Sequence, residues 1–133
     1  MQTFSGILST EIPQHWSEVA PLIEKALTYN PVYTLDDIYW NLVQRSMQLW
    51  TEVTDGKVTS VAITSVDKTL KSHICTILLA AGKLTRRWEA HLAYIEVWAK
   101  HLGCDQIEII GRPGWQRWHK GFELAYVAIR KPL

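Results

Sequence analysis

The chain has 133 residues, of which 47% are hydrophobic, and a formal net charge of +1. This length fits a single domain over residues 1–133, and the composition excludes an intrinsically disordered protein. The charge gives no overall nucleic-acid signal, but its distribution is uneven, at −5 over residues 1–67 and +6 over residues 68–133. The second half could therefore favour an anionic ligand. No apolar run reaches the roughly 20 residues that a membrane span needs.

The first 45 residues predict an edge strand and two helices. The strand covers residues 2–9. The first helix starts near Pro13, and Pro21 within its pattern is expected to kink it or to move its start later. Thr34 is a favourable N-cap for the second helix, because two acidic residues follow it in the first turn.

The middle of the chain predicts an antiparallel sheet. Residues 47–53 and 57–66 alternate as two strands, and the Asp55-Gly56 pair between them is a strong hairpin signal. Residues 73–81 add a third antiparallel strand.

A strand–helix–strand unit follows. The predicted helix has one apolar stripe at steps of four and three residues, formed by Trp88, Leu92, Ile95, Ala99 and Leu102. Gly103 ends this helix, and residues 106–110 form the next strand. Such a βαβ unit places its two strands parallel.

The C-terminal residues predict a short helix over 113–120 and a last strand over 123–130. The whole chain is therefore α+β, with α/β/α layers, a mixed sheet of about six strands around the βαβ unit, and four helices. Cys75 and Cys104 lie at the two strands of that unit and are expected to be reduced core residues in a cytoplasmic protein.

This order of elements resembles that of the GNAT-type N-acetyltransferases. Short sequence motifs also match, at the end of the long helix and at the end of the short one. Their residues are Trp98, Ala99, Leu102, Gly103, Cys104, Gly121 and Phe122. The segment with Gly111, Arg112, Gly114 and Trp115 is similar to small GNAT-like proteins of tailed phages and prophages. This resemblance implies a GNAT-like fold and a location in the host cytoplasm or the virion.

The resemblance implies that acetyl-CoA binds where the two parallel strands separate, with its pyrophosphate at the start of the long helix. Counting back from Gly103 places the family's phosphate motif at Lys83, Arg86 and Trp88, where the last two positions are normally small. One outcome is that the site no longer requires or binds CoA, with Trp88 packing at the head of the helix. The other is binding through side chains. The residues that would then serve are Leu79, Ala81, Lys83, Thr85, Arg86 and Arg87.

The resemblance also implies an acid for the leaving thiolate, often a tyrosine in the short helix, and this position holds Arg117. His119 nearby and Glu108 on the strand after the long helix are the candidate catalytic residues. For each of them, an ordinary solvated surface residue is the reading that the sequence favours over a catalytic one. Cys75 is read as a buried strand residue, not a nucleophile. We expect no metal, because His91 and His101 are ten residues apart.

The segment around the short helix is both basic and aromatic, through Arg112, Trp115, Arg117 and Trp118, and predicts a partner interface. Three functions stay open. The first is a GNAT-like phage or prophage protein, virion-associated or accessory, with a degenerate acyl-CoA site. The others are an active acyl-CoA-dependent N-acyltransferase and a host- or nucleic-acid-binding module. The expected partners are phage structural proteins or a second copy of the chain, with no membrane and no strong case for nucleic acid.

Overall fold

The structure is a computed structural model that describes residues 2–28, 30, 32–68, 71–82, 87–111, 121–123, 125 and 128–133. Their elements in chain order are β1 (Gln2–Ile7), the 3-10 turn η1 (Ser9–Glu11), α1 (Ile12–Leu27), α2 (Leu35–Val43), β2 (Gln48–Thr54), β3 (Lys57–Lys68), β4 (His73–Gly82), α3 (Trp88–His101) and β5 (Gln106–Ile109). This order confirms the α+β prediction.

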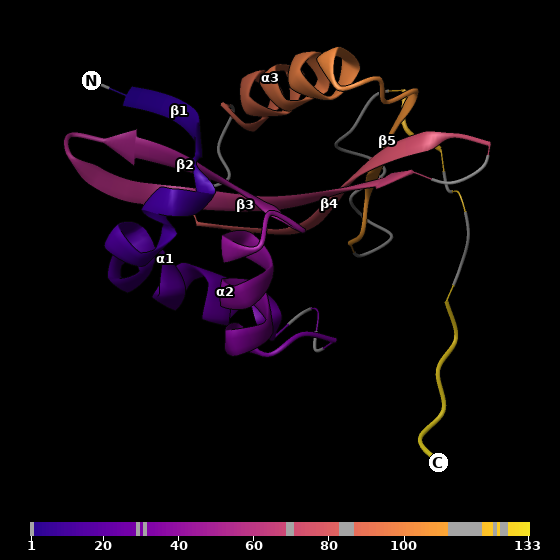
Figure 1. The fold of residues 1–133 in the computed structure, drawn as a ribbon, viewed down its shortest axis with the longest axis horizontal. Coiled ribbons are helices and arrows are strands. Elements are labelled where there is room, and N and C mark those ends of the chain that lie inside the picture. The colour runs from indigo at the N-terminus through magenta and orange to yellow at the C-terminus, as the bar shows by residue number, and fades with distance from the viewer. Residues whose placement is uncertain are drawn as a thin grey trace.

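The five strands form one sheet in the order β1-β2-β3-β4-β5. Neighbouring strands from β1 to β4 are antiparallel, and β5 is parallel to β4. Helices α1 and α2 cover one face of the sheet, and α3 covers the other (Figure 1). The central strand–helix–strand unit is therefore present as predicted.

Strand alternation divides the buried side chains between the two faces. In β2, Leu49 joins the core beneath α1 and α2, whereas Trp50 joins the core beneath α3. In β4, Cys75 faces α3, whereas Leu79 lies in the core beneath α1 and α2. The sheet thus carries a core on each face.

Helix α1 excludes one of the two effects expected of Pro21. It begins at Ile12 and continues through Pro21, so the proline does not delay its start. Pro21 is exposed, whereas Val19, Ile23 and Ala26 are buried. Packing of that opposite face stabilises the helix despite the hydrogen bond that proline removes.

Helix α2 begins as predicted. The hydroxyl of Thr34 accepts the Asp37 N–H at 3.0 Å, and the Asp37 carboxylate accepts the Thr34 N–H at 2.9 Å. These reciprocal bonds form a capping box that fixes where the helix starts.

The apolar stripe predicted for α3 is correct except at its end. Leu92, Ile95 and Ala99 are buried, but Leu102 is 49% exposed. Leu102 follows the last helical residue as the C-cap, so it no longer lies over the sheet.

The prediction of a last strand over 123–130 is wrong for the residues described there. Glu123, Ala125 and Ala128–Arg130 belong to no strand, and Ile129 is 94% exposed. The tail ends away from the sheet (Figure 1), and strand propensity gives no strand without a paired edge. The short helix expected over 113–120 lies outside the described residues.

Candidate functional site

Strand β4 extends well past its parallel partner. The ladder to β5 covers Ile74–Ile77, and the N–H of Ile110 donates to the Ile77 carbonyl at 3.1 Å. Strand β4 then continues to Gly82. Among the described residues no strand pairs with this part of β4 on the β5 side. The open edge is about 17 Å long at 3.3–3.4 Å per residue.

A β-bulge lies where this open edge begins. Ile63 pairs with Leu79, but the next residue, Thr64, pairs with Ile77, so Leu78 is the extra residue. The carbonyl of Leu78 accepts a hydrogen bond from the Asn30 side chain at 3.2 Å. Asn30 lies between α1 and α2, so their connection is tied to the bulge.

Leu79 and Ala81 were predicted to contact a cofactor. The two residues are 5% and 8% exposed, and their side chains belong to the core beneath α1 and α2. Any contact that a ligand makes with these two residues at the open edge therefore involves their main-chain atoms. Their assignment to a cofactor stays a prediction.

The last residue of β4 is held against β3. Gly82 has φ +105°, and a β-carbon there would collide with the Thr59 carbonyl and with Ser60. The glycine is thus required by packing between strands as well as by its backbone conformation.

Helix α3 begins beside a buried carboxylate on β2. Glu52 is 1% exposed. Its Oε1 accepts a hydrogen bond of 2.5 Å from the Thr59 hydroxyl. Its Oε2 lies 2.6 Å from Nε2 of His91 and 3.8 Å from Nε of Arg87. One carboxylate therefore joins β2 to β3 and to the first turns of α3.

These partners keep the carboxylate charged. Burial by itself raises the pKa of Glu52, but the hydrogen bonds from His91 and Thr59 and the charges of His91 and Arg87 outweigh it, so the pKa lies below its ordinary value. The ring of Phe4 stacks on His91 with centroids 4.0 Å apart. His91 is thus held on both its edge and its face.

Glu108, the predicted catalytic base, lies near the point where β4 and β5 separate. It pairs with Thr76, one residue before the last pair in the ladder. The preceding pair, Cys75 and Ile107, packs beneath α3, so Glu108 and Thr76 point to the other face. Glu108 is half-buried.

Cys75 is an inert core thiol, as its strand position predicts. It is 0% exposed, and burial, helped by the neighbouring Cys104, raises its pKa to about 12. Cys104 is half-buried and packs against the same core, and both cysteines are free thiols.

The residues predicted to bind phosphate are only partly described. Arg87 is the N-cap residue of α3, with its side chain 46% exposed. Trp88 is the first helical residue and packs against the core beneath α3. The other predicted site residues lie outside the described residues: Lys83, Thr85, Arg86, Arg112, Trp115, Arg117, Trp118 and His119.

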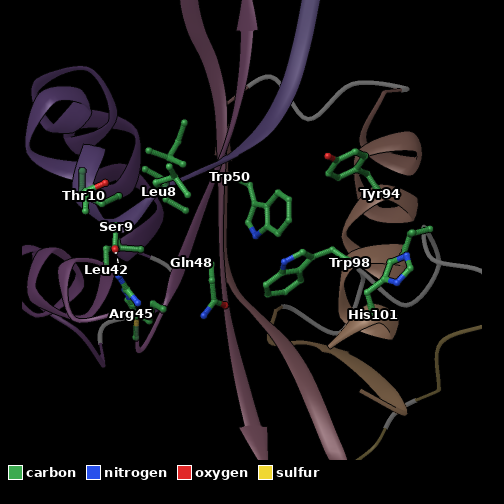
Figure 2. Close-up of a pocket in the computed structure, with 16 residues that line it drawn as sticks. Leu8, Ser9, Thr10, Leu42, Arg45, Gln48, Trp50, Tyr94, Trp98 and His101 are labelled. Carbon is green, nitrogen blue, oxygen red and sulfur yellow. Dashed lines mark hydrogen bonds between the residues drawn. The ribbon is translucent and has the colours of Figure 1, made fainter. Parts of the chain in front are cut away.

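A separate hollow of about 920 Å³ lies at the β1 edge of the sheet. Trp50 and Trp98 line it on the α3 side, and Arg45 lies with residues of α2 and η1 on the other side (Figure 2). No residue of β4 or β5 lines this hollow. It is therefore distinct from the open edge of β4.

Sequence reasoning did not find Glu52 or its contact with His91. A single acidic residue in a short strand is usually on a solvated face, and His91 was considered only as a metal ligand. Within the described part of the chain, no group of three metal-ligating side chains occurs. Nor is any helix there long and apolar enough to cross a membrane.

The sequence matches no protein-family model and no curated protein. Solved structures with a similar fold include an aminoglycoside acetyltransferase from an uncultured soil metagenomic sample in complex with sisomicin. It has a TM-score of 0.75 at 12% identity, over 99% of this chain and 96% of that one. The aminoglycoside N-acetyltransferase AAC(6')-Iy in complex with CoA has a TM-score of 0.72 at 16% identity, over 100% and 95%. A GNAT family acetyltransferase of Staphylococcus aureus has a TM-score of 0.69 at 13% identity, over 99% and 98%.

These likenesses extend over almost the whole of each chain. The chain therefore has the fold of the GNAT N-acetyltransferases, with the open edge of β4 and the start of α3 at one end of its sheet.

Proposed function

We propose that the protein is an acyl-CoA-dependent N-acyltransferase. The observation that carries this proposal is the edge of β4 beyond Ile77, open among the described residues and starting at the Leu78 bulge. In support, AAC(6')-Iy has a similar fold and was solved with CoA.

The described residues fit an acyl-CoA at this edge. A pantetheine arm carries two amide groups, and a strand edge without a partner strand binds amides as it would bind another strand. The diphosphate of the acyl-CoA would bind at the N-terminus of α3 and to the half-exposed guanidinium of Arg87. The large side chain of Trp88 packs against the core beneath α3, and in this proposal it does not contact the diphosphate.

A bound acyl-CoA would supply an acyl thioester, whose transfer to an amine forms an amide and releases the thiol. In this proposal Glu108 accepts the proton that the attacking amine loses. It lies near the separation of β4 and β5, on the face opposite α3. Asn30, between α1 and α2, donates to the carbonyl of Leu78 at the bulge, and we assign it to the wall of the acceptor pocket.

The acceptor is proposed only as a primary amine. Aminoglycosides are acted on by two of the similar proteins, which makes them suitable first members of an amine panel. A role in a phage particle, with a degenerate CoA site, stays a prediction, because none of the named structures is described as a phage protein. Mass spectrometry of purified particles tests it.

The experiment for the proposed function measures thiol release from acetyl-CoA in the presence of a panel of amines. We expect release that depends on both enzyme and amine, with an acetylated product seen by mass spectrometry. A protein that binds acetyl-CoA but acetylates no amine of the panel would contradict transferase activity.

A further inference from the structure

We infer that Glu52 is a positioning residue that fixes the start of α3 for the diphosphate of acyl-CoA. This inference rests on the proposed function. It extends that function to residues of β2 and β3 that do not reach the open edge of β4 themselves.

The two ends of the connection from β4 to α3 are held by the same two residues, Thr59 and Glu52. At its entry, Gly82 packs against the carbonyl of Thr59. At its exit, Arg87 and His91 contact the carboxylate of Glu52. Thr59 and Glu52 are themselves hydrogen bonded at 2.5 Å. The end of β4 and the start of α3 are thus both held by one hydrogen-bonded pair, Thr59 and Glu52.

The contacts of Glu52 at the start of α3 are compatible with only one position of this helix. A buried carboxylate is costly unless its oxygens are hydrogen bonded. Glu52 meets this need only when His91 and Thr59 both point to it. Since Arg87 precedes His91 by four residues, the two side chains lie on the same side of α3. Rotation or sliding of the helix would separate Glu52 from both.

Charge and position predict opposite effects of removing this carboxylate. Glu52 is an anion near the site of a polyanionic ligand, so loss of its charge alone would strengthen CoA binding. Loss of its positioning contacts would weaken CoA binding instead. Glu89 provides the matched control, since it is an exposed acid in the first turn of the same helix.

The test compares Glu52→Gln with Glu89→Gln by calorimetric titration with CoA. We expect Glu52→Gln to weaken binding by about tenfold, equivalent to about 1.4 kcal/mol. Glu89→Gln should leave binding unchanged or slightly stronger. The value of kcat/KM with S-acetylpantetheine, which lacks the diphosphate, should change by less than about twofold in Glu52→Gln. Equal or tighter CoA binding by Glu52→Gln would overturn the inference.

A second pair of variants separates positioning from packing. A glutamine at position 91 can place an amide donor near the position of Nε2, whereas leucine cannot. His91→Gln should keep CoA binding within about threefold, and His91→Leu should lose about tenfold. Equal losses in both variants would contradict a positioning contact. If the wild-type protein binds no CoA, the proposed function fails together with this inference; if it binds and the Glu52 variant binds equally well, only the inference fails.

Discussion

Gly82 at the end of β4 packs directly on the backbone carbonyl of Thr59 in β3. Its φ of +105° is one that residues with a β-carbon rarely adopt, and the space for a β-carbon is already filled. We therefore expect Gly82→Ala to lower the free energy of unfolding by more than about 2 kcal/mol. Urea unfolding measures this loss.

Gly103 is the matched control for this substitution. It also has a positive φ, +86°, but a β-carbon added there would have nothing within 4 Å. Gly103→Ala should therefore cost only about 1 kcal/mol, from backbone strain alone. Equal losses at the two glycines would show that contact with Thr59 does not constrain Gly82.

We expect the contribution of Glu52 to the free energy of unfolding to depend on pH in the acidic range. Its pKa lies below the ordinary value of 4.5 through its contacts with Thr59 and His91 and the charge of Arg87. A group with a lowered folded-state pKa stabilises the fold above its unfolded pKa and loses this contribution as pH falls through the folded value. The difference in unfolding free energy between wild type and Glu52→Gln should therefore shrink below about pH 4.5.

Among the described residues, the ionisable side chains that contact Glu52 are Arg87 and His91, both from the start of α3. On its other sides β1 supplies Phe4, in register with Glu52, and β3 supplies Thr59. A difference that stays constant down to about pH 3 would contradict a lowered pKa for Glu52.

Cys75 is predicted to be unreactive in the folded protein. Its pKa of about 12 leaves almost no thiolate at pH 8, and its side chain is fully buried. Iodoacetamide should modify Cys75 only after unfolding in guanidinium chloride, as followed by mass spectrometry. Rapid modification of the native protein would contradict this structure of the core.

Glu108 is predicted to act in catalysis and not in acyl-CoA binding. Glu108→Gln removes the proposed base with little change in shape, so kcat should fall about 100-fold or more while KM for acetyl-CoA stays within about twofold. Glu24 is an exposed acid on α1, and Glu24→Gln serves as the control with unchanged kinetics. A kcat for Glu108→Gln within about threefold of wild type would exclude it as the base.

Local signals predicted much of this fold. The N-cap at Thr34, the turn at Asp55-Gly56 and the central βαβ unit all depend on residues close in the chain, and all are present. The sequence left open whether Pro21 would kink α1 or delay its start, because packing of the helix face against the sheet decides this and outweighs local propensity there.

The site was less predictable, for a physical reason. Glu52 and His91 are 39 residues apart, and Asn30 and Leu78 are 48 apart. Both contacts depend on strand register and on how a helix lies across the sheet, which periodicity does not encode. Glu108 could be placed on a strand from the sequence, but not at the point where β4 and β5 separate.

The open edge of β4 as the binding site for acyl-CoA is tested most directly by calorimetric titration of the wild-type protein with acetyl-CoA. We expect one site per chain with a micromolar dissociation constant, and weaker binding when S-acetylpantetheine replaces acetyl-CoA. No heat of binding at millimolar acetyl-CoA, confirmed by the absence of a shift in melting temperature, would contradict it.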